Sequence, residues 1–288
     1  EATDSDLDPA EIVKRLSTLF DWALGQLGCE SDDVWSIAIA APGAIDSIER
    51  SAIAPMWSYH VPAWRSFPVV EELMVRYQAS VCVRTRIQMM TLGEFRSRSG
   101  AGIKDLLVID MGREIKAGII SNGFVHLGAQ GAAGLIGHFS TGQESVTRCA
   151  CGNTGCLNVL AGSEKIAADG TRAAREGASN YLAEVLMENG KVAPTDVLLA
   201  AEQGDSFSAE LLSRCGRLTG AAIAQLVNAL NPSAVVLTGT IAQSGNTLLA
   251  SVRETVYRNA HPLVTRDLRI TRSQMGSSAS LAGAALVA

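Results

Sequence analysis

Four residues able to hold a metal ion lie within a short stretch of this chain. His138 closes the segment Gly134-Leu-Ile-Gly-His138, and three thiols follow at Cys149, Cys151 and Cys156 in a Cys-x-Cys-Gly-x-x-Gly-Cys pattern. One imidazole and three thiolates satisfy the tetrahedral nitrogen and sulfur coordination that Zn²⁺ adopts in proteins. Because four protein ligands leave no open position for water, we interpret this as a structural zinc site rather than a catalytic one.

The alternative is a group of ordinary buried cysteines or a disulfide. Gly152 and Gly155 permit backbone angles that a Cβ would disfavour, so the loop is able to wrap an ion. Three clustered cysteines cannot all pair with one another, and a chain without secretory features keeps its thiols reduced. These points favour the metal over the disulfide.

The elements that must position these ligands alternate between strands and helices. Apolar runs predict strands at 34–41, 81–83, 106–110, 115–120, 234–240 and 268–271, with a turn at Asn122-Gly123. Periodicity and capping residues predict helices at 9–27, 67–77, 87–98, 205–230 and 278–287, and further helices from 162 onward and up to 259. The first helix should bury one apolar face formed by Ile12, Leu16, Leu19, Phe20, Ala23 and Leu27. This alternation predicts an α/β protein with mixed sheets.

The Gly-x-x-Gly-His segment and the cysteine pattern together resemble the signature of the ROK family (repressor, open reading frame, kinase). The likeness extends from about Trp35 to the C-terminus. It implies an actin-like, RNase-H-like two-lobed ATPase fold with a zinc-binding loop. The family contains both sugar kinases and sugar-responsive transcription factors, so the resemblance leaves the choice between these functions open.

The resemblance also implies a division into lobes. We expect an N-terminal lobe at 1–103, completed by a C-terminal helix at 276–288, and a C-terminal lobe at 104–275 that carries the zinc loop and an oligomerisation surface. The family's first hairpin, with its Asp-x-Gly-Gly-Thr motif, has no counterpart here, and the chain starts with Glu rather than Met. We therefore expect that hairpin, and a helix-turn-helix as in the family's repressors, to lie upstream of this sequence.

The position of the family's catalytic carboxylate carries a different residue here. ROK kinases place a Glu-Asn-Asp-Ala-Asn run before a Leu-Gly-Glu, and this chain reads Arg84-Thr85-Arg86-Ile87-Gln88 before its own Leu-Gly-Glu. Thr85 thus matches the family's Asn, and Arg86 matches its catalytic Asp. Arginine stays protonated in proteins and cannot act as a general base.

The sugar-binding positions that the resemblance assigns have also changed. Two glutamates that hold sugar hydroxyls in the family correspond to Leu135 and Asn158, and only His138 is retained. Leucine offers no hydrogen-bond acceptor. Arg84 and Arg86 instead suggest an anionic ligand such as a sugar phosphate, or else an ion pair with Asp46 or Glu114.

The nucleotide positions are altered in the same way. The family's glycine-rich phosphate hairpin reads Gly112-Arg113-Glu114-Ile115-Lys116, whose bulky side chains should keep backbone amides away from phosphate oxygens. We expect Lys116 to be an exposed hairpin charge rather than a phosphate ligand. The turn at Thr238-Gly239-Thr240 keeps one glycine and should be structural.

Other chemically capable residues carry weaker signals. Asp110 ends a predicted strand, where it could be a metal–phosphate carboxylate or a turn former. Three histidines have no partner at ligand spacing: His60, His126 and His261. The aromatic residues Trp57, Tyr59 and Trp64 could stack on a sugar ring, although packing of an irregular segment is the simpler interpretation.

Composition excludes several classes of protein. The net charge is −5, so the chain as a whole has no electrostatic attraction to DNA or to acidic membranes. No apolar run approaches the ~20 residues of a membrane span, and the acidic N-terminus is not a signal peptide. We expect a cytoplasmic protein that does not bind membranes.

The leading hypothesis is the ligand-sensing and oligomerising part of a ROK transcriptional regulator that has no kinase activity. Its partners would be a sugar or sugar phosphate effector, DNA through an N-terminal region outside this chain, and a second copy in a homodimer or homotetramer. The alternatives are a divergent ROK sugar kinase that phosphorylates hexoses with ATP, and a scaffold that binds no ligand.

Overall fold

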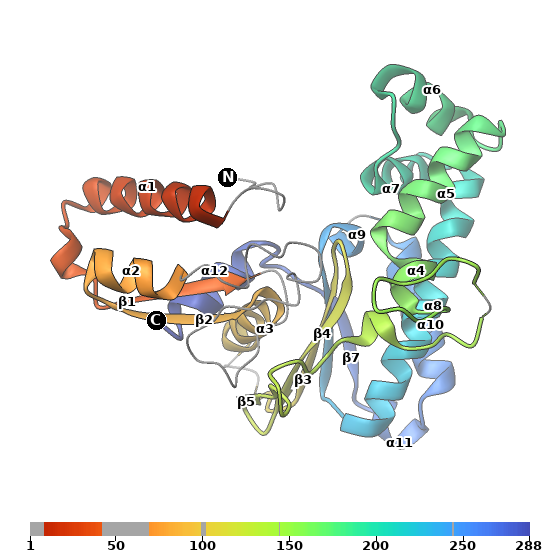
Figure 1. The fold of residues 1–288 in the computed structure, drawn as a ribbon. Helices are drawn as coiled ribbons and strands as arrows, with labels where there is room; N and C mark the ends of the chain where they lie inside the picture. Colours follow the sequence, from red (N-terminus) through yellow and green to blue (C-terminus); the bar gives the residue numbers. More distant parts are fainter. Residues whose placement is uncertain (1–8, 42–68, 99–101, 144, 244) are drawn as a thin grey trace. The chain divides into compact units, whose positions relative to one another are not determined.

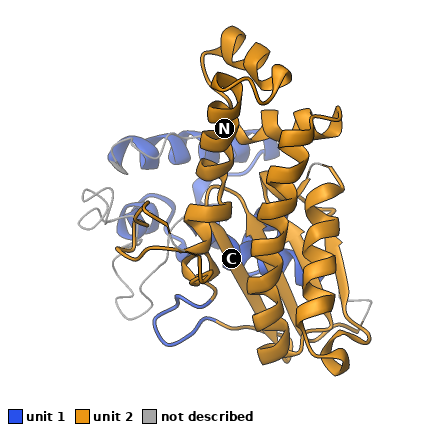
Figure 2. Cartoon of the chain, turned by 90° about the vertical axis from the view of Figure 1, so that its right-hand side faces the viewer, with its two compact units in different colours: residues 1–96, 127–133, 278–288 blue, residues 97–126, 134–277 orange. Residues whose placement is uncertain are grey.

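The computed structural model describes residues 9–41, 69–98, 102–143, 145–243 and 245–288. These residues form two compact units (Figure 2). Unit 1 consists of residues 1–96, 127–133 and 278–288, and unit 2 of residues 97–126 and 134–277. The lobes expected from the sequence divided at 103/104 and 275/276, so the segment 127–133 is the main difference between the two divisions.

Unit 1 is built on two parallel strands, β1 (Ser36–Ala41) and β2 (Ser80–Thr85), which pair in register from Ser36–Ser80 to Ala41–Thr85. The unit also contains α1 (Pro9–Leu27), the short turn η1 (Ser31–Asp33), α2 (Val69–Tyr77), α3 (Arg86–Ser97) and α12 (Ser278–Ala285). Its core joins α1 and α2 to β1 through Ile12, Val13, Ile37, Val69, Leu73 and Tyr77.

The helix α1 buries most of the face that its sequence predicted, since Ile12 is buried and Leu16 and Phe20 pack against the core. Two predicted residues differ, because Leu19 and Leu27 are 42% and 75% exposed, and Val13 and Ser17 are buried in addition. The reason lies in α2, because the Tyr77 hydroxyl donates to the Ser17 carbonyl (3.1 Å) and to the Asp21 carboxylate (2.8 Å). These bonds turn the Ser17 side of α1 inward.

The last helix of the chain packs directly on α3 in unit 1. A Cβ placed on Gly93 would lie 2.1 Å from the Ala279 carbonyl oxygen, and one on Gly283 would lie 1.8 Å from that of Met89. The two backbones therefore touch, and only glycine fits at either position.

Unit 2 is organised around a five-stranded sheet in the order β5-β4-β3-β6-β7 (Figure 1). Its strands are β3 (Leu106–Met111), β4 (Ile115–Ser121), β5 (Phe124–Val125), β6 (Ala234–Thr238) and β7 (Arg269–Arg272). The pairs β5–β4 and β4–β3 are antiparallel, and β3–β6 and β6–β7 are parallel. Every residue of β3 and β6 is buried, as expected for central strands of a sheet that is covered on both faces.

The helices of unit 2 cover this sheet and extend beyond it. They are α4 (Leu157–Ala161), α5 (Ser163–Arg175), α6 (Asn180–Asn189), α7 (Pro194–Glu202), α8 (Ser206–Leu230), α9 (Thr240–Gln243), α10 (Thr247–Asn259) and α11 (Pro262–Thr265). The prediction of a helix at 205–230 is confirmed by α8, which is capped by the Asp205 side chain and ends at Asn231 in the left-handed conformation.

Candidate metal centre and the adjoining hairpin

His138 is the last residue of a short 3₁₀ turn, η5 (Ile136–His138), which lies beside strand β4. The Ala117 amide donates to the Gly134 carbonyl at 2.8 Å. Gly134 has φ +93°, and a Cβ there would lie 1.8 Å from the Ala117 carbonyl oxygen. Only glycine lets the chain approach β4 so closely, and this contact fixes the start of the turn that carries the imidazole.

The three cysteines lie on a tight loop. Gly152 and Gly155 adopt φ +92° and +69°, as the sequence pattern required. The Cys149 amide donates to the Asn153 carbonyl at 2.8 Å, and isolated β-bridges join Ser140 to Cys156 and Arg148 to Thr154. The backbone thus turns back on itself and aims the thiols inward.

The four predicted ligands come together in the structure. Ligand atoms of His138, Cys149, Cys151 and Cys156 all lie within 4.8 Å of one another, and we call these residues the metal cluster. His138 Nδ1 is 3.4 Å from Cys149 Sγ, and Cys151 Sγ is 3.6 Å from Cys156 Sγ. A tetrahedron with metal–sulfur bonds of about 2.3 Å has edges of about 3.8 Å, so these separations suit an ion at the centre.

The pKa values of two of the thiols are shifted in opposite directions. Burial, together with the neighbouring thiols, raises the pKa of Cys156 to about 12. A backbone hydrogen bond at Asn153 is the main cause that lowers the pKa of Cys151. Cys156 is therefore a neutral thiol at pH 7 unless a metal ion binds and displaces its proton.

Asn158 connects the metal cluster to the β3–β4 hairpin. Its side-chain Oδ1 accepts a hydrogen bond from the Ile115 amide at 2.8 Å, and a Cβ on Gly137 would collide with its amide group. Leu135 is the half-buried residue that precedes η5. Unit 2 thus brings together three of the predicted ligand-binding positions: Leu135, His138 and Asn158.

The tip of the β3–β4 hairpin holds charged pairs. Lys116 Nζ lies 2.7 Å from Glu114 Oε2, and Arg113 Nε lies 3.8 Å from Glu164 Oε1. Burial acts to raise the pKa of Glu114, but Lys116 outweighs it and the pKa lies below its ordinary value. The prediction that Lys116 is an exposed charge is wrong, because its side chain is 16% exposed and pairs with Glu114.

Thr85 and Arg86 belong to unit 1, where Thr85 ends β2 and Arg86 begins α3. Thr85 Oγ1 accepts from the Gln88 amide at 3.2 Å, and Gln88 Oε1 accepts from the Thr85 amide at 3.1 Å, which is a reciprocal capping box. Gln88 Nε2 also donates to the Gly131 carbonyl at 2.9 Å. Arg86 is the first residue of the helix and is partly exposed, and Arg84 is exposed.

Asp110 lies inside β3 and is 2% exposed, so the prediction of a turn former is wrong. Gly239, at φ +88°, packs against it, since a Cβ there would lie 2.4 Å from Asp110 Oδ1. His126 and His261 are exposed. The predicted candidates Asp46, Trp57, Tyr59, His60 and Trp64 lie outside the described residues.

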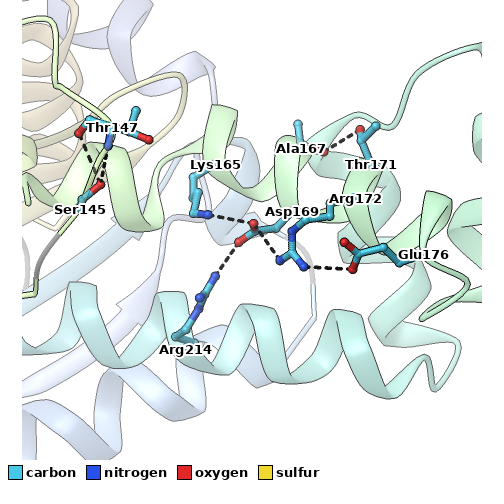
Figure 3. A network of polar contacts seen from close by, with 9 residues as sticks. All are labelled: Ser145, Thr147, Lys165, Ala167, Asp169, Thr171, Arg172, Glu176 and Arg214. Carbon is cyan, nitrogen blue, oxygen red and sulfur yellow. Dashed lines mark hydrogen bonds and ion pairs between the residues drawn. The ribbon is translucent and has the colours of Figure 1, made fainter.

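One polar cluster in unit 2 was not predicted from the sequence (Figure 3). The Asp169 carboxylate, on α5, is 4% exposed and bonds to Lys165 at 2.8 Å, to Arg172 at 3.2 Å and to Arg214 on α8 at 2.6 Å. Burial acts to raise the pKa of Asp169, but these cations outweigh it and hold the pKa below its ordinary value. The i, i+3 and i, i+4 spacing of the three α5 residues was the available signal.

The known proteins that this chain is similar to include kinases and repressors. It is 30% identical over 276 residues to a glucokinase of Halalkalibacterium halodurans, covering 95% of this chain and 82% of that protein. It is 28% identical over 252 residues to the N-acetylglucosamine repressor of Escherichia coli O157:H7, covering 88% of this chain and 60% of that protein. The chain thus spans well under two thirds of the repressor's length.

A solved structure and a family model agree with these relatives. A ROK family transcriptional regulator described as a homolog of the E. coli MLC protein superposes with a TM-score of 0.80 at 25% identity, covering 98% of this chain and 69% of that one. The model of the ROK family matches residues 10–288. The chain therefore belongs to the ROK family.

Proposed function

We propose that this chain is the ligand-sensing and oligomerising part of a ROK transcriptional regulator and that it does not act as a sugar kinase. The observation that carries the proposal is Arg86, which stands at the start of α3 where the motif of ROK kinases has its catalytic Asp. A guanidinium remains protonated and cannot accept the proton of a sugar hydroxyl.

The β3–β4 hairpin supports the same proposal. A phosphate-binding hairpin needs small residues so that backbone amides can close on phosphate oxygens. Here Glu114 pairs with Lys116, and Arg113 faces Glu164, so large paired side chains form the tip in place of small residues.

We also propose that the metal cluster holds a structural Zn²⁺. The four ligands are one imidazole and three thiols, which fill all four positions of a tetrahedron and therefore suit a structural rather than a catalytic ion.

Within the residues that the structure describes, no helix is both long enough and apolar enough to cross a membrane. We propose a cytoplasmic protein that forms a homodimer or homotetramer.

The partners follow from the repressor relatives. We propose that a sugar or sugar phosphate is the effector and that DNA is bound by an N-terminal region outside this sequence. Thr85, Arg86, Leu135, His138 and Asn158 are the positions proposed for the effector. Arg86 at the start of α3 favours a phosphorylated sugar, because a guanidinium group binds phosphate with two parallel hydrogen bonds.

The experiment combines binding and turnover on one preparation. Isothermal titration would be carried out with sugars, sugar phosphates and ATP, and ADP formation would be measured with each sugar. We expect a sugar or sugar phosphate to bind without ATP and without ADP formation. Arg86→Ala should weaken a phosphorylated ligand by roughly tenfold more than its unphosphorylated form.

The matched control is Arg84→Ala, which removes the neighbouring exposed arginine but leaves the motif position intact. Sugar-dependent ADP formation by the unaltered chain would overturn the proposal. Equal effects of the two arginine variants would contradict the assigned role of Arg86 alone.

A divergent sugar kinase is the second candidate, favoured by the 30% identity to a glucokinase over 95% of this chain. In that case ATP and a hexose should both bind, and another residue must supply the base. The turnover measurement above separates the two candidates directly.

A further inference from the structure

A pocket of about 380 Å³ lies in unit 2. Its lining residues fall within 177–181 and 200–205, outside the segment that carries the metal cluster. It is formed where the loop between α5 and α6 meets the loop between α7 and α8, at the end of α5 that Figure 1 draws beside α6 and α7. Gly177 and Gly204 line it with φ +70° and +90°. A volume of this size is within the range that small-molecule sites occupy.

Two helix caps fix the loops that line the pocket. Ser179 is 2% exposed, and its hydroxyl oxygen accepts from the Leu182 amide at 3.1 Å, which caps α6. Asp205 caps α8 by accepting from the Ser208 amide at 2.8 Å. Ser179 also contributes to lowering the pKa of the Asp205 carboxylate. Both groups are therefore held in place before any ligand arrives.

The charge on the pocket lining is negative. Burial acts to raise the pKa of Asp205, but the bonds from Ser208 and Ser179 outweigh it and hold the pKa below its ordinary value. The carboxylate has about four acceptor positions, so it can accept further hydrogen bonds from a ligand. No Lys or Arg is among the described residues that line the pocket, which disfavours a phosphate.

The walls supply an aromatic ring and two amides. Tyr181 packs partly against the core of the unit, so its ring is anchored, while Asn180 and Gln203 are exposed. Each amide side chain both donates and accepts hydrogen bonds. A sugar presents hydroxyl groups that also donate and accept, together with an apolar ring face that can lie on an aromatic side chain.

We propose that this pocket binds a neutral monosaccharide, at a place distinct from the effector positions Leu135, His138 and Asn158. The carboxylate of Asp205 accepts from sugar hydroxyls, the amides of Asn180 and Gln203 complete the hydrogen bonds, and the ring of Tyr181 covers one sugar face. The inference goes beyond the proposed function and does not depend on it.

The test is a titration of the full chain with glucose, N-acetylglucosamine, xylose and the cationic sugar glucosamine. Gln203→Ala should weaken the neutral sugar by roughly tenfold, since it removes hydrogen bonds to hydroxyl groups. Asp205→Asn keeps a residue that caps helices well, so the fold should persist, while one acceptor becomes a donor and affinity falls. Gln26→Ala, an exposed change on α1, is the control and should leave binding unaltered.

Three results would overturn the inference. They are no binding by any neutral sugar, binding by glucosamine alone, and binding that neither Gln203→Ala nor Asp205→Asn weakens. In the last case the sugar sits elsewhere, and a change of affinity on Leu135→Glu would place it at the effector positions, so the proposed function would stand while this pocket would not. Thermal unfolding of each variant checks that the fold is intact.

Discussion

The metal cluster and the tip of the β3–β4 hairpin lie next to each other in unit 2 but differ in completeness. The cluster has all four ligands that its sequence pattern predicts, gathered within 4.8 Å. The hairpin has lost the small residues that a phosphate requires and contains the pair between Glu114 and Lys116 instead. Asn158 bonds to the hairpin backbone and packs against the turn that carries His138, so both regions share one support.

The two regions should depend on a ligand to different degrees. The cysteine loop has few regular elements of its own, so the proposed ion would be what organises it. The hairpin is held by the antiparallel register from Leu106–Ile120 to Met111–Ile115, whatever residues form its tip. A turn supported by a sheet keeps its shape when the residues at its tip change, whereas a loop supported by the proposed metal would not keep its shape without its ligands.

Loss of one metal ligand should produce the largest effect. Cys156 is 1% exposed, and Cys156→Ser should abolish stoichiometric zinc and lower the free energy of unfolding by more than about 3 kcal/mol. Metal analysis and denaturant unfolding measure the two quantities. Cys29→Ser, outside the cluster, is the control. Full zinc content in the Cys156 variant would show that the cluster does not organise the loop.

The Asp169 network tests whether a polar cluster without a metal contributes as much to the free energy of unfolding as the metal cluster does. Asp169→Ala leaves three cations without their shared carboxylate, and we expect a loss of about 2 kcal/mol, because the cations can still reach water. Glu254→Ala breaks an exposed pair with Arg258 and should cost under about 0.5 kcal/mol. Equal losses in the two variants would mean that burial of Asp169 adds nothing.

The same network predicts a dependence on pH. The folded pKa of Asp169 lies below its unfolded value near 3.8, so the unfolded state binds the proton first. Its stabilisation is complete above that value and is lost as the pH falls through the lower folded pKa. The free energy of unfolding, measured from about pH 5 down to about pH 2, should therefore depend less on pH in Asp169→Asn than in the unaltered chain.

Asn158→Ala should disconnect the hairpin from the metal cluster. The Ile115 amide, which belongs to a buried residue, would lose its acceptor at a cost of about 1 to 2 kcal/mol, while zinc content should remain unchanged. Asn158→Asp keeps an acceptor and should cost less. Loss of zinc in the alanine variant would show that the two regions are not independent.

The smallest effect is expected at the hairpin tip. Glu114→Gln removes the pair with Lys116, in which the Glu114 side chain is 48% exposed, and should cost about 0.5 kcal/mol at low salt. The pKa of Glu114 lies below its ordinary value, so this contribution is present at neutral pH and is lost on acidification. Since salt screens exposed charges, the unaltered chain and the variant should converge at 1 M salt.

Local signals in the sequence were enough to predict most helices and strands and the metal cluster. The residue pattern at Cys149–Cys156 specifies a loop almost by itself, and Asp205 and Asn231 mark both ends of α8. Boundaries differed by a few residues, as at β2, which extends from Ser80 to Thr85 instead of 81–83. Fraying and strand pairing decide such ends, and neither is encoded locally.

Predictions failed where a distant partner decides the outcome. The burial of Ser17 on α1 was missed because it depends on Tyr77, which lies 60 residues away in the sequence. Lys116 is the exception, because its partner Glu114 is only two residues away and the prediction of an exposed charge was still wrong. Arg214 completes the Asp169 network from a different helix, and the pocket at Ser179 and Asp205 joins two loops; periodicity reports neither.

The contact between Gly93 and Gly283 has a consequence for how this protein is made. The helix α12 follows every other described element in the sequence, yet its backbone completes the unit that contains α1. During synthesis α3 emerges long before α12, so the surface over Gly93 is exposed to water or to a chaperone until α12 has been made. A polypeptide that stops before Ser278 would contain all four residues of the metal cluster but would lack α12 in unit 1, and we expect it to be degraded by proteases.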